Sequence, residues 1–182
     1  MEWYCKSFDE LTAEELYEIL RLRVDVFVVE QQCPYPEVDG KDRESVQLFA
    51  REGQRVTACL RLFWKSGEPG VLCMGRVAAA VRGKGLGGEL LKRGVAVAFD
   101  ELGASEIYIE SQEYARGFYA REGFVTCSEP FMEDGIPHVQ MRLRREDRKP
   151  RRKRRKCGKK ALHFRFPCVI ISSASDVSSA VT

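Results

Sequence analysis

The heptapeptide Arg82-Gly-Lys-Gly-Leu-Gly-Gly88 joins two segments with different patterns of apolar residues. Before it, residues 71–80 are almost continuously apolar, which is typical of a buried strand. After it, residues 89–102 place apolar side chains at helical spacing. A helix that begins at a glycine-rich turn has unpaired N–H groups in its first turn, and such groups bind phosphate. The sequence therefore predicts an anion site here, with Arg82 and Lys84 adding positive charge.

Two common nucleotide-binding motifs do not fit this turn. A P-loop requires Lys followed by Ser or Thr after its last glycine, whereas Gly87 is followed by Gly88 and Glu89. A dinucleotide-binding fold has its glycine fingerprint after the first strand, and this turn comes much later in the chain. A tight glycine turn without a ligand remains as the alternative.

The other segments predict helices and strands in alternation. Thr12 and Glu15 form a capping-box pattern, which predicts a helix over residues 13–28. Two prolines and a glycine predict a loop at 33–40. The remaining expected elements are a hairpin of strands 46–50 and 55–64, strands 107–110, 124–127 and 139–143, and a helix at 114–121. This order predicts one α/β sandwich.

Charge divides the chain into a body and a tail. Residues 1–143 hold 17 Lys and Arg against 24 Asp and Glu, whereas residues 144–182 hold 13 against 3. We therefore expect one domain at 1–145 and a basic, disordered tail at 146–182. The acidic body suits a cationic acceptor, and the basic segment 144–160 would contact nucleic acid only weakly and without sequence preference.

The cysteines and apolar runs indicate a location in the cell. Seven cysteines are widely spaced and never form a CxxC pair, which argues against a disulfide framework and a zinc site and predicts a cytoplasmic protein. No run approaches the roughly 20 apolar residues of a membrane span, so no membrane contact is expected. We interpret the basic run 151–156 as a solvated appendage, and a nuclear-import signal is the alternative if the source is a eukaryote.

Several motifs resemble those of a known family. Arg82-x-x-Gly85-x-Gly87 is similar to the pyrophosphate loop, R/Q-x-x-G-x-G/A, of the GNAT superfamily of acetyltransferases. Residues 22–35, Leu-Arg-Val-Asp-Val-Phe-Val-Val-Glu-Gln-Gln-Cys-Pro-Tyr, resemble the signature of its ElaA-like members.

The resemblance covers most of residues 2–143, including the stretch Gln112-x-x-Ala-x-x-Phe-Tyr-x-x-x-Gly-Phe124. Gln47 stands where the family has His, and Glu110-Ser111 stands where small residues are usual. These two departures bear on the choice of substrate.

The resemblance implies a GNAT-type three-layer αβα sandwich with a mixed, splayed central sheet, and acetyl-CoA as co-substrate. The pantetheine arm would hydrogen-bond the backbone of residues 77–79, and the diphosphate would lie on residues 83–88. The positions similar to cofactor-binding residues are Val77, Ala78, Ala79, Arg82, Gly83, Lys84, Gly85, Leu86, Gly87, Gly88 and Gln112. A primary amine would attack the thioester directly in a ternary complex.

Four residues are candidates for the chemistry. Tyr119 matches the family position whose hydroxyl protonates the departing thiolate, and an ordinary core tyrosine is the alternative. Glu30, after the apolar run 26–29, and Glu110, at a strand end, are candidates for the base that accepts the amine proton. Glu30 also lies where it would contact the acceptor, unless it is a solvated helix-end carboxylate. His138 would position the substrate or be structural, and no metal site is expected.

A function of a different class also fits these motifs. The chain would then be a non-catalytic acyl-CoA-binding module, tethered to nucleic acid by its basic tail. Retention of Tyr119 favours the enzyme. The glycine turn does not distinguish an acetyl group from a longer acyl group, and the sequence is compatible with a monomer or a homodimer.

Overall fold

The computed structural model describes residues 1–148, which form an eight-stranded mixed sheet with helices on both faces. The strand order is β1-β2-β3-β4-β5-β8-β6, and β7 pairs with β8. The strands are β1 (Glu2–Ser7), β2 (Val46–Glu52), β3 (Arg55–Trp64), β4 (Val71–Ala79), β5 (Glu106–Gln112), β6 (Val125–Thr126), β7 (Phe131–Glu133) and β8 (Ile136–Arg144). The expected α/β sandwich with a mixed central sheet is confirmed.

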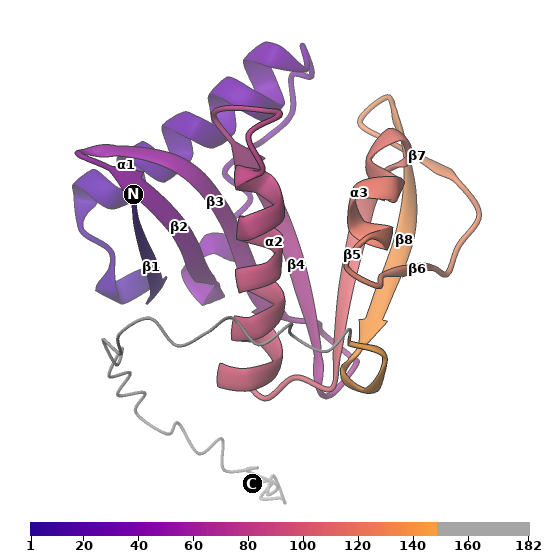
Figure 1. Ribbon diagram of the computed structural model, residues 1–182. Helices are drawn as coiled ribbons and strands as arrows, with labels where there is room; N and C mark the ends of the chain where they lie inside the picture. Colours follow the sequence, from indigo (N-terminus) through magenta and orange to yellow (C-terminus); the bar gives the residue numbers. More distant parts are fainter. Residues whose placement is uncertain (149–182) are drawn as a thin grey trace, which may run out of the picture. The chain divides into compact units, whose positions relative to one another are not determined.

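Two layers of helix enclose this sheet. One face carries α1 (Ala13–Arg23), which continues as the π-helix η2 (Val24–Glu30), and the other carries α2 (Leu86–Ala96) and α3 (Arg116–Ala120) (Figure 1). A second π-helical segment, η4 (Val97–Glu101), extends α2. Short 3₁₀ turns complete the described chain: η1 (Phe8–Glu10), η3 (Lys41–Glu44), η5 (Glu113–Ala115) and η6 (Arg145–Asp147). Within residues 1–148, no helix is long and apolar enough to cross a membrane.

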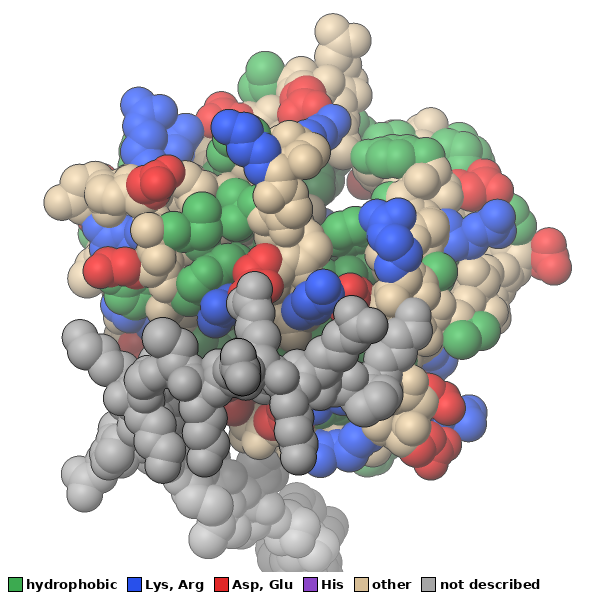
Figure 2. Space-filling model, in the orientation of Figure 1, with side chains coloured by type: hydrophobic (Ala, Val, Ile, Leu, Met, Phe, Trp, Pro, Cys, Tyr) green, Lys and Arg blue, Asp and Glu red, His purple; other side chains and the backbone are tan. Residues whose placement is uncertain are grey.

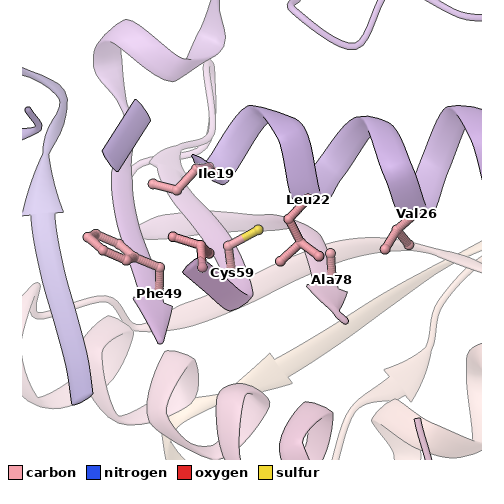
Figure 3. Packing of buried hydrophobic residues seen from close by; sticks show 7 residues of the cluster. Ile19, Leu22, Val26, Phe49, Cys59 and Ala78 are labelled. Atoms are coloured by element: carbon pink, nitrogen blue, oxygen red, sulfur yellow. The ribbon is translucent and has the colours of Figure 1, made fainter. Parts of the chain in front are cut away.

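Helix α1 packs on the sheet through one apolar stripe. Ile19, Leu22 and Val26 recur at helical spacing and bury against side chains of β2, β3 and β4 (Figure 3). The sheet contributes Phe49, Val56, Cys59 and Ala78 to this cluster. The predicted capping box is confirmed, because Thr12 Oγ1 accepts from Glu15 N–H at 3.2 Å and the Glu15 carboxylate accepts from Thr12 N–H at 2.9 Å.

Strands β4 and β5 separate after a short parallel pairing. Val71, Leu72 and Cys73 pair with residues 106–108, and no pair follows. The two strands therefore diverge toward the end of the sheet where the loop before α2 lies (Figure 1). On its other edge, β4 stays paired with β3, but the register shifts between Cys59 and Arg61. This shift leaves two residues of β4, Arg76 and Val77, opposite one residue of β3, which is a β-bulge.

Several boundaries differ from the sequence-based expectation. Strands β1 and β7 were not expected, since their residues lack clear alternation; each forms because it pairs antiparallel with a neighbour. Helix α2 begins at Leu86, three residues earlier than predicted, although Gly87 and Gly88 disfavour helix. The fold includes residues 146–148, whereas the rest of the expected tail, with its basic run at 151–156, lies outside the described residues.

Candidate functional site

A cavity of about 870 Å³ opens where β4 and β5 diverge. Its glycine-loop side is lined by residues 77–79, Arg82 and Gly87 together with η5 and α3, and its network side by residues 33–44, β3, β5 and the β7–β8 hairpin. Figure 2 shows the surface hollowed between α2 and α3, with hydrophobic side chains in the hollow and Lys or Arg side chains above the start of α2. The cavity brings together nine of the predicted site residues: Val77, Ala78, Ala79, Arg82, Gly87, Glu110, Gln112, Tyr119 and His138.

The turn before α2 has the geometry that an anion site requires. Gly83 and Gly85 have φ values of +80° and +79°, which residues with a side chain rarely adopt. The first intrahelical bond runs from Glu89 N–H to Gly85 C=O at 3.0 Å. The N–H groups of residues 86–88 therefore precede the hydrogen-bond ladder and point out of the helix start. Gly83, Lys84, Gly85, Leu86 and Gly88 adjoin the cavity through this turn but do not line it.

The second backbone element of the site is the free edge of β4. Ala78 and Ala79 pair with Cys59 and Ala58 of β3, and β5 is already too far away to pair on the other side. The backbone groups of residues 77–79 on that side are available to an extended ligand, which would add to the sheet as a strand. A diphosphate on the α2 turn and an extended arm along this edge match the two ends of coenzyme A, so the described residues fit an acyl-CoA.

Tyr119 lines the cavity from α3. Its ring packs edge-on against Phe118 and Phe124, with centroid distances of 5.1 and 5.9 Å. Within residues 1–148, no group hydrogen-bonds its hydroxyl. Burial raises the pKa of Tyr119, with a smaller contribution from Tyr114, so the phenol stays protonated throughout the neutral range. A protonated, unshared hydroxyl at a cavity wall can donate a proton or a hydrogen bond to a ligand.

The structure places Glu30 outside the cavity lining. Its carboxylate pairs with the Arg82 guanidinium at 2.6 Å, and both side chains are more than half exposed, at 51% and 63%. The next residue, Gln31, reaches the other arm of the splayed sheet, where its amide exchanges hydrogen bonds of 3.0 and 3.3 Å with Gln112. Residues 30 and 31 thus connect the end of η2 to both sides of the cavity mouth.

Glu110 and His138 line the network side. Glu110 is exposed and accepts a hydrogen bond of 2.7 Å from the Tyr108 hydroxyl. Burial, together with this bond, raises the pKa of Tyr108, which therefore remains a donor. His138 Nδ1 lies 2.8 Å from the Ile136 carbonyl oxygen, and this bond fixes the ring orientation. Of the two predicted carboxylates, Glu110 is the one in the cavity.

A cluster of six charged residues, which we call the arginine–carboxylate network, borders the network side. It consists of Arg23, Arg61, Arg76, Glu37, Asp39 and Asp42. Arg23 is 1% exposed; it contacts the Glu37 carboxylate and donates to Asp42 Oδ1 and Oδ2 at 2.7 and 3.2 Å. A charged side chain buried this deeply is tolerated only when it is paired.

Arg61 extends the network along β3. Its Nη1 donates to Asp39 at 2.8 Å and to Asp42 at 3.2 Å. Burial would raise the pKa of Asp39, but the hydrogen bonds and charge of Arg61 lower it to about 2, so Asp39 is ionised at neutral pH and is no proton acceptor there. Gln47, which departs from the family pattern, donates to Asp42 at 3.1 Å and so belongs to the same cluster.

Sequence reasoning recovered the glycine-loop side better than the network side. None of the six residues of the arginine–carboxylate network was among the predicted site residues. The available signal was indirect: Arg61 interrupts an apolar run of β3 that is otherwise buried, and a buried arginine requires a carboxylate partner. The identity of those carboxylates depends on contacts between residues up to 22 positions apart.

Comparisons with known proteins agree with this geometry. The profile of the Acetyltransferase (GNAT) domain matches residues 12–145. UPF0039 protein C11D3.02c of Schizosaccharomyces pombe is 39% identical over 147 residues, covering 79% of this chain and 97% of that protein. Protein ElaA of Escherichia coli is 31% identical over 145 residues, covering 78% and 95%.

Two solved structures are similar over nearly their whole length. An acyl-CoA N-acyltransferase from Pseudomonas aeruginosa superimposes with a TM-score of 0.72 at 39% identity, covering 78% of this chain and 99% of that one. The crystal structure of Escherichia coli ElaA also gives a TM-score of 0.72, at 30% identity, covering 78% and 97%. The chain therefore belongs to the GNAT acetyltransferase superfamily, among the ElaA and UPF0039 proteins, and acts in acyl transfer from an acyl-CoA.

Proposed function

We propose that this protein transfers an acetyl group from acetyl-CoA to a primary amine, by direct attack in a ternary complex. The observation that carries the proposal is the cavity between β4 and β5, which joins a diphosphate turn to a free strand edge and is also lined by Tyr119. Coenzyme A has a diphosphate at one end of an extended arm and a thioester at the other. The turn before α2 suits the diphosphate, and the strand edge suits the extended arm.

We assign the parts of acetyl-CoA to residues on the glycine-loop side. The N–H groups of residues 86–88, with Arg82 and Lys84, bind the diphosphate. The backbone of residues 77–79 binds the pantetheine arm, and Gln112 lines the same passage. The thioester then lies near Tyr119, since this residue borders the cavity from α3.

The acceptor amine approaches from the network side. Its nitrogen lone pair forms a bond to the thioester carbonyl carbon, and the carbon–sulfur bond then breaks. The thiolate takes a proton from the Tyr119 hydroxyl, and the amine nitrogen loses one proton to a base. The products are an N-acetylated amine and free coenzyme A.

We assign the base to Glu110 in preference to Glu30. Glu110 lines the cavity and accepts only one hydrogen bond within the described chain, so an oxygen remains for the amine. Glu30 is engaged by Arg82 and does not line the cavity. His138, on the same side as Glu110, contributes to the wall against which the acceptor is positioned.

The test is release of coenzyme A thiol from acetyl-CoA in the presence of amines, polyamines, amino acids and basic peptides. We expect turnover with one class, a large loss in Tyr119→Phe, and a loss in Glu110→Gln that Glu30→Gln does not show. Tight coenzyme A binding without thiol release on any acceptor would contradict the proposal and favour a non-catalytic acyl-CoA-binding module. Faster release with a longer acyl-CoA would contradict the acetyl assignment alone.

A further inference from the structure

Arg76 occupies an unusual backbone position at the centre of the site. It lies in the β-bulge of β4, three residues after the last pair with β5, and has a φ of +54°. A non-glycine residue in this region is strained and persists only where its surroundings fix it. The residues that follow it, Val77 to Ala79, form the free strand edge to which we assign the pantetheine arm.

The surroundings that fix Arg76 come from the loop between η2 and η3. Its Nε lies 3.0 and 3.2 Å from the two oxygens of Glu37, and its Nη2 lies 3.5 Å from Asp39. The guanidinium also stacks on the Tyr35 ring at 5.1 Å. Glu37 is in turn buried and held by Arg23 of α1. The side chain of Arg76 therefore ties the bulge to the most deeply buried part of the arginine–carboxylate network.

We infer that Arg76 is a positioning residue for the acyl-CoA: its anchor to Glu37 and Asp39 holds the β4 bulge open and so sets the strand edge that receives the pantetheine arm. The inference rests on the proposed function. It predicts that the cofactor's arm and its diphosphate are bound by separable parts of the chain. The arm depends on Arg76, whereas the diphosphate depends on the turn before α2.

Two probes separate these parts. Coenzyme A occupies both, whereas 3′-phospho-ADP, the same molecule without its pantetheine, occupies the diphosphate turn alone. Titration calorimetry of the full chain would measure both ligands on the wild type and on three variants. Arg76→Ala removes the anchor, Arg76→Gly removes it while permitting positive φ, and Arg76→Lys keeps the charge but not the planar fork.

We expect Arg76→Ala and Arg76→Gly to weaken coenzyme A binding by about tenfold while leaving 3′-phospho-ADP binding within about twofold of the wild type. Arg76→Lys should recover part of the loss. The KM for acetyl-CoA should rise most in Arg76→Ala and Arg76→Gly and less in Arg76→Lys. In each variant kcat should change less than KM. Arg51→Ala, on β2 and outside the cavity lining, is the matched control and should change neither ligand.

Retained 3′-phospho-ADP binding also shows that each variant is folded. Wild-type affinity for coenzyme A in Arg76→Gly would overturn the inference, because the backbone conformation alone would then suffice. Equal loss of both ligands in all three variants would overturn it as well, since Arg76 would then support the fold in general. If the wild type binds coenzyme A no more tightly than 3′-phospho-ADP, the pantetheine arm makes no favourable contact. That result would contradict both the strand-edge assignment and the proposed function.

Discussion

The two sides of the cavity are built in different ways. The glycine-loop side offers backbone groups from one continuous stretch, residues 77–88, and the geometry of its turn is set by glycines and by the start of α2. The network side uses side chains from at least five separate segments, and its geometry is set by buried charges that pair across the fold. Changes on the first side should therefore affect ligand binding with little effect on stability, whereas changes at Arg23 and its buried partners in the arginine–carboxylate network should mainly affect stability. Arg76 is the member of the network that adjoins the strand edge, so its changes should affect ligand binding.

The largest effect is expected from Arg23→Met. This change leaves Glu37 and Asp42 buried without their main partner, so the free energy of unfolding should fall by about 3–5 kcal/mol in urea denaturation. Arg21→Met, two residues earlier on α1, removes partly exposed pairs to Glu18 and Asp25 and should cost less than about 1 kcal/mol. Equal costs for the two variants would mean that the network does not stabilise the fold.

Tyr119→Phe tests the role of the Tyr119 hydroxyl in the reaction without a change in the stability of the fold. The change removes only a hydroxyl, so kcat should fall by about 100-fold or more while the Kd for coenzyme A and the free energy of unfolding stay the same. Because the pKa of Tyr119 is raised, its proton should not be lost in the neutral range, and the wild-type kcat should not decline between pH 7 and 9 through this group. An unchanged kcat in the variant would remove Tyr119 as the general acid.

Gly85→Ala tests whether the glycine-loop side depends on backbone shape. Nothing lies within 4 Å of the added Cβ, so the cost is the φ of +79°, roughly 1–2 kcal/mol. Part of this cost should appear as coenzyme A binding weakened by about tenfold. Gly53→Ala is a matched control in the β2–β3 turn, with φ +62° and equally open space, and it should leave binding unchanged. Similar binding losses in both variants would indicate a general effect on the fold.

Much of the glycine-loop side was predictable from the sequence, and the reason is physical. A strand, a glycine turn and a helix start are local features, so an anion site at Gly85 and Gly87 could be predicted from the residues, whereas the role of the backbone of residues 77–79 was implied by the family resemblance. The β4–β5 divergence and the bulge at Arg76 could not be derived from the residues alone, because they result from pairing between distant strands. Glu30 shows the same limit: its apolar neighbours favoured a site in the cavity, but Arg82, 52 positions later, engages it instead.

A pH series tests the network at one of its carboxylates. The folded pKa of Asp39, about 2, lies below its ordinary value of 3.8, so its stabilising contribution is present above about pH 4 and is lost as the pH falls toward 2. Asp39→Asn has no carboxylate to protonate, so its stability does not change through this group as the pH falls. The stability difference between wild type and Asp39→Asn should therefore shrink between pH 4 and pH 2 in urea denaturation. A constant difference would place the pKa of Asp39 near its ordinary value.

The smallest effect is expected from Glu30→Gln. Its ion pair with Arg82 is exposed, and the diphosphate would compete for the same guanidinium. Removing the carboxylate should tighten coenzyme A binding by about twofold to threefold, less so at high salt, without lowering kcat. A tenfold fall in kcat with unchanged coenzyme A affinity would instead make Glu30 the base and displace Glu110 from that role.

The most direct test of the central claim is to follow backbone amide resonances of the ¹⁵N-labelled protein during titration with coenzyme A. The largest shifts should fall in two segments, residues 77–79 and residues 85–88, with Gln112 next. Large shifts confined to other parts of the chain, or no saturable shift in either segment, would contradict the placement of the acyl-CoA between β4 and β5.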